Sequence, residues 1–332
     1  MSSAYQAFRV DKTEDRKYPR SVVELEAADL PEGELLIDVA YSSLNYKDAL
    51  SATGNPGVTR NFPHTPGIDA AGVVAESSVA AFSPGDEVIA IGFDLGMNTA
   101  GGFGQKIRIP AGWAVPMPSG LDLRTSMTLG TAGFTAALCV DKLEAAGMSP
   151  ESGPVLVTGS TGGVGCVAVK LLAKLGYEVH AVTGKAAQHG FLNSLGASAI
   201  MSREEALAGA DRPLGRETWG GVVDTVGGQI LVNAVKSLRY GMSLAACGLV
   251  ASPEIPATVL PFILRHVNLL GVDSVELPLA QKEAIWRKLG GEWRLDGLDD
   301  LARPLRLDTL SAAIDRILAG EMVGRGLVDL SA

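Results

Sequence analysis

A glycine-rich run in the middle of the chain is one of two segments whose residue types could do chemistry. TGSTGGVG occupies residues 158–165, directly after an apolar run and directly before a helical pattern. Glycine lets the backbone approach a pyrophosphate closely, and a helix that begins there offers free N–H groups and a positive dipole end. The spacing is Gly-x-x-Gly-Gly-x-Gly and not the Gly-x-Gly-x-x-Gly fingerprint, so the run alone is a weak signal. Its position between a strand and a helix favours a dinucleotide site over a glycine turn needed only for packing.

The residues after the next strand indicate which dinucleotide would bind. Sites for NAD usually carry Asp or Glu there, where a carboxylate bonds the adenosine ribose hydroxyls. In this chain the strand ends in Thr183, Gly184 and Lys185, and Arg203 follows the third strand. A hydroxyl, a small residue and two cations suit a 2′-phosphate, so we expect NADP(H). The alternative for Lys185 is a solvated surface lysine.

The second reactive segment is Asn45, Tyr46, Lys47 and Asp48, which follows a predicted strand. The Tyr46 hydroxyl can donate to an oxyanion or supply a proton, and the Asn45 amide can orient a substrate carbonyl. Lys47 can lower the pKa of Tyr46 or meet a phosphate, and Asp48 can hold the lysine. Composition alone favours a plainer interpretation, a polar turn from strand to helix with Asp48 as a cap.

Histidine and cysteine show no spacing typical of a metal site. The four histidines are His64, His180, His189 and His266, and the three cysteines are Cys139, Cys166 and Cys247. The cysteines are far apart and lie in apolar runs, which indicates buried reduced thiols rather than a disulfide or a metal site. We therefore expect no metal.

Two patterns of secondary structure must position these residues. About the first 125 residues are rich in strand patterns and Gly/Pro/Asn-rich loops, which predicts a barrel-like β domain. From residue 154 onward six strands alternate with helices, which predicts a doubly wound parallel sheet. A mostly apolar helix is expected over 122–147, and a helix, a turn and a strand over 307–330. The expected strands of the first part are 34–44, 67–77, 85–91 and the end of 101–110; the later helices are Val164–Leu175, 186–197, one from Ser202 and one near Val232–Leu238.

Bulk composition sets limits on the class of protein. A chain of 332 residues suggests two domains, and 47% hydrophobic with 20% charged residues is typical of a globular protein. The net charge of −9 makes bulk nucleic-acid binding an unlikely function. Neither a signal-peptide pattern nor an apolar run of membrane-spanning length is present, so the cytoplasm is the expected location.

Several longer runs resemble one known family over nearly the whole chain. They are SSLNYKDAL (42–50), PGIDAAG (66–72), GTAGFTAALCV (130–140), TGSTGGVG, DTVGG (224–228), AACGL (245–249), PFILRHVNLLGVDSV (261–275) and GRGLVDL (324–330). Through them the chain resembles the zinc-independent acrylyl-CoA reductase and quinone-oxidoreductase-like branch of the medium-chain dehydrogenase/reductase superfamily. The resemblance implies an α/β fold: a discontinuous GroES-like β-rich catalytic domain (1–127 and 277–332) and a Rossmann NADPH-binding domain (128–276). It also implies a homodimer formed through the cofactor domain.

The resemblance also bears on the absence of metal. Zinc members of the superfamily carry Cys where this chain has Asn45, and a His-Glu pair where it has Ile68 and Asp69. The cysteine-rich structural-zinc loop is missing as well. Alcohol oxidation therefore becomes unlikely, and hydride transfer to an activated C=C bond remains.

The resemblance further assigns site residues. Tyr46 would act in the chemistry and also meet the cofactor. Leu249 and Ile263 would contact the nicotinamide half through backbone groups, and the alternative for both is a place in the apolar core. Arg325, expected as an exposed cation between two glycines, would close the site together with Ser274. Lys185 stands where relatives often have Arg, so the preference for NADPH would be less strict. The pyrophosphate would meet Ser160, Thr161, Gly162, Gly163 and Val164, and Thr131 and Thr135 would line the nicotinamide pocket.

The predicted function is the NADPH-dependent reduction of acryloyl-CoA, or a similar short 2-enoyl-CoA, to propanoyl-CoA. Hydride would reach the β-carbon, Tyr46 or Asn45 would stabilise the enolate oxygen, and Tyr46 or water would protonate the α-carbon. Arg60, Lys47 and Arg325 are candidate cations for the anionic CoA. The alternatives are an NADPH:quinone or small-enone reductase and a catalytically silent NADPH-binding sensor, which the Asn-Tyr-Lys-Asp run argues against.

Overall fold

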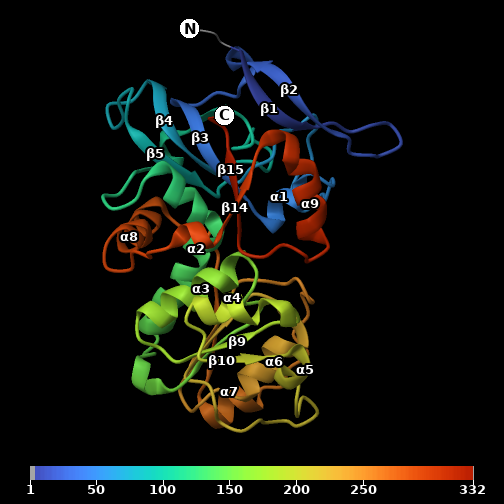
Figure 1. The fold of residues 1–332 in the computed structure, drawn as a ribbon, viewed down its shortest axis with the longest axis vertical. Coiled ribbons are helices and arrows are strands. Elements are labelled where there is room, and N and C mark those ends of the chain that lie inside the picture. The colour runs from blue at the N-terminus through green and yellow to red at the C-terminus, as the bar shows by residue number, and fades with distance from the viewer. Residues whose placement is uncertain (1–3, 332) are drawn as a thin grey trace. The chain divides into compact units, whose positions relative to one another are not determined.

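The computed structural model describes residues 4–331, which form two compact units (Figure 1). Unit 1 contains the chain up to Thr131 and again from Val275, and unit 2 is Ala132–Ser274. The domain borders expected from the sequence, after residues 127 and 276, fall a few residues from these limits. Within the described residues no helix is long and apolar enough to cross a membrane.

Unit 1 is built on a seven-stranded sheet in the order β14-β15-β3-β4-β5-β7, with β6 also paired to β3. The C-terminal strand β15 pairs antiparallel with β3, so an early and a late segment of the chain lie side by side in one sheet (Figure 1). The strands are β3 (Leu35–Leu44), β4 (Asp69–Ser77), β5 (Glu87–Ile91), β6 (Lys106–Ile109), β7 (Ala114–Pro116), β14 (Ala302–Leu305) and β15 (Arg325–Asp329), beside an antiparallel hairpin of β1 (Ala4–Val10) and β2 (Arg20–Glu26). The helices are α1 (Tyr46–Ser51), α8 (Leu279–Gly290), α9 (Leu310–Leu318) and the start of α2 (Leu123–Ala145).

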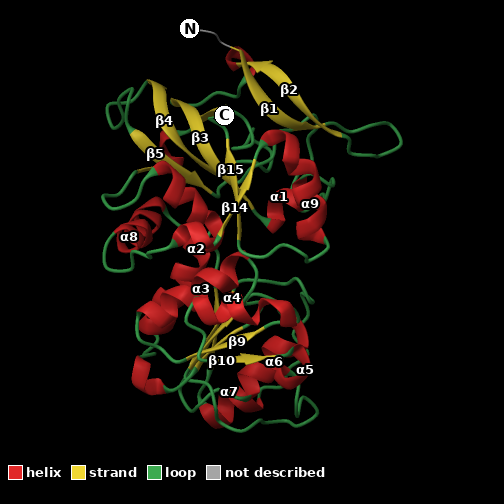
Figure 2. Ribbon diagram, viewed as in Figure 1, coloured by secondary structure: helices red, strands yellow, loops and turns green. Residues whose placement is uncertain are grey.

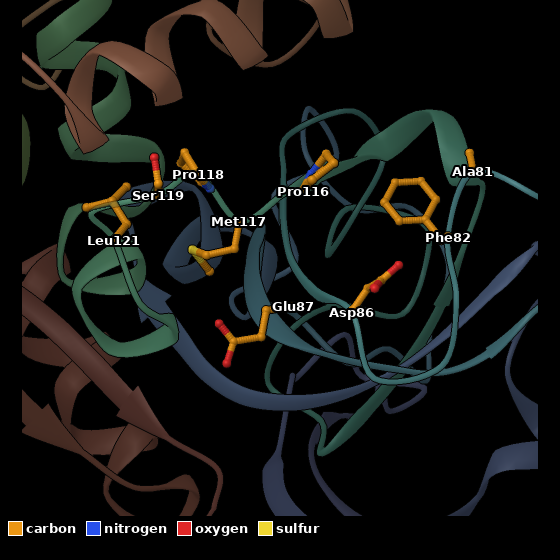
Figure 3. A pocket seen from close by; sticks show the side chains of 9 residues that line it. All are labelled: Ala81, Phe82, Asp86, Glu87, Pro116, Met117, Pro118, Ser119 and Leu121. Atoms are coloured by element: carbon orange, nitrogen blue, oxygen red, sulfur yellow. The ribbon is translucent and has the colours of Figure 1, made fainter.

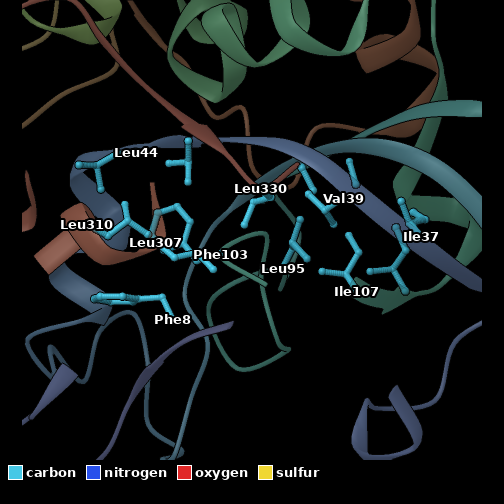
Figure 4. Packing of buried hydrophobic residues seen from close by; sticks show 14 of the residues in the cluster. Phe8, Ile37, Val39, Leu44, Leu95, Phe103, Ile107, Leu307, Leu310 and Leu330 are labelled. Carbon is cyan, nitrogen blue, oxygen red and sulfur yellow. The ribbon is translucent and has the colours of Figure 1, made fainter. Parts of the chain in front are cut away.

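The core of unit 1 follows from the period-two pattern of its strands. Alternate residues of a strand share one face, so Ile37 of β3 and its register partner Ile107 of β6 are both buried. Phe8 meets Phe103 edge to face at a centroid distance of 6.3 Å. Figure 4 shows these side chains gathered with Leu307 and others from the C-terminal segment. The same apolar cluster thus joins the first and last parts of the chain.

Unit 2 is a parallel sheet of six strands in the order β10-β9-β8-β11-β12-β13. Helices lie on both sides of these strands (Figure 2). The strands are β8 (Val155–Val157), β9 (Val179–Val182), β10 (Ala199–Met201), β11 (Gly221–Asp224), β12 (Ser243–Ala246) and β13 (Asn268–Gly271); the helices include α3 (Gly163–Lys174), α4 (His189–Ser194), α5 (Arg203–Ala206), α6 (Gly228–Lys236) and α7 (Leu260–Arg265). The strand order reverses between β8 and β11, and ligands of such sheets bind at the carboxyl ends of the strands on either side of that point.

The predicted fold class is confirmed, with local differences. The helix expected over 122–147 is α2, but it is kinked at Gly130, whose φ of 52° and ψ of −160° are not helical. In the described residues the strand path of unit 1 starts at β14 and ends at β7, so the expected barrel-like domain is an open path of hydrogen-bonded strands. Helix α6 begins at Gly228, earlier than expected. The β1–β2 hairpin, α8 and β14 are not predicted by the sequence patterns.

Candidate functional site

The reactive turn of unit 1 begins where β3 ends. Asn45 precedes helix α1, and the Asp48 carboxylate accepts the Asn45 backbone N–H at 2.7 Å and that of Ile68 at 2.8 Å. The first bond closes the turn on itself, and the second ties it to the residue before β4. Tyr46, the first residue of the helix, is 37% exposed. A buried carboxylate therefore holds the backbone of the turn while the tyrosine side chain reaches solvent.

The structure gives Asp48 a different partner from the expected one. We expected it to hold Lys47, but its carboxylate is fully buried and bonded to the two backbone N–H groups. Burial, with the nearby Asp69 carboxylate as a second cause, raises the pKa of Asp48 to about 7. This geometry is that of a helix cap, the plainer of the two interpretations of the sequence.

Asn45 is held by its side chain as well as its backbone. Its Nδ2 donates to Asp69 Oδ2 at 2.8 Å, and its Oδ1 accepts from Arg325 Nη1 at 3.3 Å. We expected this amide to orient a substrate carbonyl, but protein groups bind it at both ends. Asn45 and Asp69, which by the resemblance stand where zinc members carry a Cys and the Glu of a His-Glu pair, are here bonded to each other.

The expectation that Arg325 is exposed is wrong. We expected an exposed cation, but its side chain is only 2% exposed. Arg325 is the first residue of β15, and its Nε donates to the Thr128 carbonyl at 3.0 Å while its Nη2 donates to Ser43 Oγ at 2.9 Å. The flanking glycines belong to a strand start inside unit 1 rather than to a surface turn.

The threonines of the GTAGFT segment contact different groups. Thr131 belongs to unit 1, where its backbone N–H donates to Asp69 Oδ2 at 2.9 Å and its hydroxyl donates to the same carboxylate. Thr135 belongs to unit 2, where its hydroxyl donates to Ser274 Oγ at 2.9 Å. Both Thr135 and Ser274 are buried.

Asp69 and Ser43 are members of this site that the sequence analysis did not select. Both are buried, and the Ser43 hydroxyl donates to Asp69 Oδ2. The available signal was the acidic residue in GIDAAG, because Asp inside an apolar strand is rarely buried without partners.

In unit 2 the glycine turn is shaped by close packing. Gly159 has a φ of +60°, and a Cβ there would lie 2.3 Å from Thr225 Oγ1. A Cβ on Gly165 would lie 2.4 Å from the Gly159 carbonyl oxygen. A Cβ on Gly162 would meet its nearest neighbour only at 3.3 Å. Two of these glycines are therefore required by the turn itself, as the packing interpretation proposed.

The start of α3 supplies the donors that a pyrophosphate needs. Gly163 and Val164 are the first two residues of the helix, and N–H groups at that position have no acceptor within the helix. Ser160 differs, since its N–H donates to the Val182 carbonyl at 3.1 Å and its Oγ donates to the Val157 carbonyl at 2.7 Å. The geometry thus favours Gly163 and Val164 over Ser160 as phosphate contacts.

One small pocket of unit 2 collects five of the expected cofactor residues. It is lined by Thr161, Thr183, Gly184, Lys185 and Arg203, together with Thr158, Gly159, Val182, Val226 and Ile230. A Cβ on Gly184 would lie 2.8 Å from Arg203 Nε, so the guanidinium packs directly over this glycine. The lining offers two cations and no carboxylate, and it therefore fits the 2′-phosphate of NADP(H).

A buried carboxylate also ties the strands on either side of the switch point. Asp224, at the end of β11, accepts Thr158 Oγ1 at 2.7 Å and the Gly227 N–H at 2.8 Å, and burial raises its pKa. Thr225 Oγ1 donates to the Thr158 carbonyl at 2.9 Å. These bonds hold the segment after β11 against the segment after β8, where the glycine turn begins. The sequence analysis did not identify them.

Leu249 and Ile263 lie on the surface of unit 2. Their side chains are 60% and 69% exposed. The predicted cofactor contacts used their backbone groups and stay a prediction.

A larger hollow in unit 1 has the wrong charge for an anionic ligand. Figure 3 shows Asp86 and Glu87 beside Phe82 and Met117, and no lysine or arginine is among its lining residues. The lining contains no residue that we expected at the site. It does not suit a CoA phosphate.

Comparison with known proteins identifies two family domains. Residues 31–119 match the alcohol dehydrogenase GroES-like domain, and residues 163–287 match the zinc-binding dehydrogenase domain. Within the described residues no group of three or more His, Cys, Asp or Glu side chains could hold a metal ion.

Several known proteins are similar to this chain over nearly its whole length. The acrylyl-CoA reductase AcuI of Ruegeria pomeroyi is 46% identical over 329 residues, covering 99% of this chain and 100% of the relative. The putative quinone oxidoreductase YhfP of Bacillus subtilis is 43% identical over 99% of this chain and all of its own, and the structure of yhfP with NAD bound matches with a TM-score of 0.96. The yhdH oxidoreductase of Salmonella enterica, in complex with NADP, is 44% identical with a TM-score of 0.95, covering 98% of this chain and 100% of that one.

Proposed function

Since the chain belongs to the acrylyl-CoA reductase-like branch of the medium-chain dehydrogenase/reductase superfamily, we propose that it reduces the C=C bond of acryloyl-CoA, or of a similar short 2-enoyl-CoA, with NADPH. The observation that carries the proposal is the similarity to an acrylyl-CoA reductase over 99% of this chain. The product from acryloyl-CoA is propanoyl-CoA.

The residues of unit 2 fit the cofactor. NADPH, when bound, supplies the hydride for the reduction. Lys185 and Arg203 would bind its 2′-phosphate, since both line the same pocket beside Thr183. The first N–H groups of α3 would bind the pyrophosphate. The residues that line this pocket include no carboxylate, which would bind the ribose hydroxyls of NAD and repel a 2′-phosphate.

Tyr46 is the residue of unit 1 best suited to the chemistry. Reduction of a C=C bond conjugated to a thioester places negative charge on the thioester oxygen. The Tyr46 side chain is partly exposed on a turn whose backbone is held by Asp48. Its hydroxyl would donate to that oxygen or supply the proton to the α-carbon.

Only some of the expected cations suit the CoA moiety. Arg325 is buried and bonded inside unit 1. Arg60 is exposed and Lys47 is partly exposed, so these two are the proposed contacts for CoA phosphates. A cytoplasmic location is a further proposal from the sequence.

A quinone or small-enone reductase is the second candidate. The similarity to the putative quinone oxidoreductase YhfP, at 43% identity, favours it. The same cofactor pocket and Tyr46 turn would serve either acceptor, because both reductions deliver negative charge to a carbonyl oxygen.

The function is tested by measuring NADPH oxidation with acryloyl-CoA, with a benzoquinone, and with NADH replacing NADPH. We expect rapid turnover of the thioester, a much lower rate with NADH and little activity with the quinone. Turnover of the quinone alone would establish the second candidate. Tight NADPH binding without turnover of either acceptor would indicate a binding sensor. A short thioester of acrylate without CoA is the control, and equal activity with it would remove CoA recognition from the proposal.

Replacing Tyr46 with Phe removes the hydroxyl and leaves the ring. We expect kcat to fall about 100-fold or more, because proton donation to the transition state is lost. The dissociation constant of NADPH, measured by fluorescence titration, should change little. Full turnover by Tyr46→Phe would remove this tyrosine from the chemistry.

Replacing Arg203 with Ala tests the 2′-phosphate contact. We expect the KM for NADPH to rise on the order of 10- to 100-fold while the KM for NADH stays within about twofold, since a charge-assisted hydrogen bond to the phosphate is lost. Arg216→Ala, which removes an arginine of unit 2 outside the pocket, is the matched control. An equal rise for both cofactors would contradict a specific role in phosphate binding.

We also propose that two copies of the chain associate through unit 2. Strand β13 ends the order of the parallel sheet and is paired to β12 on its inner side. Near it in sequence, six large apolar side chains are more than half exposed: Leu249, Val250, Ile255, Val259, Ile263 and Leu264. Several exposed apolar side chains close in sequence to the edge strand of a sheet are typical of an interface between subunits.

Sedimentation velocity should give twice the mass of the 34.4 kDa chain. Val259→Asp with Leu264→Asp should shift the protein to the monomer, because a carboxylate buried without a partner disfavours association. Val22→Asp, an exposed apolar position on β2 of unit 1, is the control and should stay dimeric. A monomeric wild-type protein at micromolar concentration would refute the proposal.

A further inference from the structure

Beneath the Tyr46 turn lies a group of buried polar side chains from four separate segments of unit 1. We call Ser43, Asn45, Asp69, Thr131 and Arg325 the buried polar cluster. Asp69 Oδ2 accepts from Ser43 Oγ, from Asn45 Nδ2 at 2.8 Å and from the Thr131 N–H at 2.9 Å. The four segments are the end of β3 with the turn that follows it, the start of β4, the kink of α2 and the start of β15.

The cluster contains one anion and one cation, both removed from water. Asp69 is 0% exposed and Arg325 is 2% exposed. Arg325 donates to Ser43 Oγ at 2.9 Å and to Asn45 Oδ1 at 3.3 Å, and both of these residues in turn donate to Asp69. Ser43 and Asn45 therefore bridge the guanidinium and the carboxylate. Buried charges require such partners, because an ion without them in the interior is costly.

This arrangement determines which way the Asn45 amide points. Its NH₂ group faces an anion and its oxygen faces a cation, so the reversed orientation would place a donor against a donor and an acceptor against an acceptor. The backbone N–H of Asn45 is bonded at the same time to Asp48. The residue directly before Tyr46 is therefore held by both its side chain and its backbone.

The packing around the cluster leaves little room for adjustment. Gly130 lies at the kink of α2 with a φ of 52°. A Cβ on it would lie 2.2 Å from Ser43 Oγ, 2.5 Å from Asp69 Oδ2 and 2.8 Å from Arg325 Nη2. Backbone without a side chain is required there, so the helix kink and the cluster are fitted to each other.

We propose that Asp69 and Arg325 are positioning residues of the reductase: acting through Asn45 and Ser43, they fix the turn that presents Tyr46. The inference rests on the proposed role of Tyr46 in the reduction. It assigns Asn45 to the support of Tyr46 rather than to contact with substrate. A buried charge with a structural role alone would affect stability and leave kcat per folded enzyme unchanged.

The first test compares Asp69→Asn with a destabilised core variant. Asp69→Asn should lower kcat on the order of 10-fold or more, since misplacement of a reacting group is costly, while the KM for NADPH stays within about twofold. Ile107→Ala, in the core of unit 1 away from the cluster, should lower the Tm and keep kcat. If both variants keep kcat, Asp69 is structural and the proposal is overturned.

A double-mutant cycle tests whether Asp69 acts through Asn45. We expect the losses of Asp69→Asn and Asn45→Ala to be strongly non-additive, with the double variant about as slow as the worse single variant. Additive losses would show that Asp69 acts by another route. Where Asp69→Asn does not fold, Ser43→Ala replaces it in the cycle, because it removes one bridge between the two charges and keeps both of them.

A second cycle pairs Asp69→Asn with Tyr46→Phe and separates this inference from the proposed function. Little further loss in the double variant supports positioning of Tyr46, and additive losses refute it. If Tyr46→Phe alone keeps full turnover, the proposed role of Tyr46 fails and this inference fails with it. Non-additive losses of Asp69→Asn and Asn45→Ala in the first cycle would then mean that the buried polar cluster positions a catalytic group other than Tyr46. All of these rates are measured with whichever acceptor the wild-type enzyme turns over, so a wrong substrate does not affect the result.

Discussion

The buried carboxylate of Asp69 is the group on which the arrangement of unit 1 around the Tyr46 turn depends. Its side chain has no access to water, so the chain must bring donors to it. Those donors come from the end of β3, from the turn before α1 and from the kink of α2. Arg325 adds the opposite charge from the last strand through Ser43 and Asn45. One electrostatic requirement thereby fixes the relative positions of four segments, among them the turn that carries Tyr46.

Unit 2 also contains a buried carboxylate, Asp224, and close packing of its backbone around the glycine turn. The parallel sheet leaves a crevice where its strand order reverses, and Asp224 and Thr225 close the base of that crevice by bonding Thr158. The glycine turn then packs onto Thr225 so closely that Gly159 admits no side chain. The turn also leaves Gly163 and Val164, the first residues of α3, partly exposed, and their N–H groups are the proposed contacts for the pyrophosphate. The interpretations of the glycine run as packing and as cofactor binding are compatible.

The resemblance compares positions 45 and 69 with the Cys and the Glu of the His-Glu pair in zinc members, and in this chain both positions carry buried polar residues. At positions 45 and 69 an amide and a carboxylate are bonded to each other, and Arg325 supplies a positive charge to the group. A cation held by the chain itself balances the buried anion. On the turn directly after Asn45, Tyr46 is exposed, and its hydroxyl is the group proposed for the chemistry.

Local patterns in the sequence determined much of this protein. The alternation of strands and helices after residue 154 and the glycine turn depend on neighbours within a few positions. The types of Thr183, Gly184, Lys185 and Arg203 could be read from the sequence, but the fold brings Arg203, which follows β10, to the other three in the pocket of unit 2. The partners of buried charges were decided only by the tertiary structure. Arg325 meets Asn45 across 280 positions, and Asp69 meets Thr131 across 62. The sequence shows that an arginine stands between two glycines, but burial depends on how β15 pairs with β3, and that pairing exists only in the folded chain.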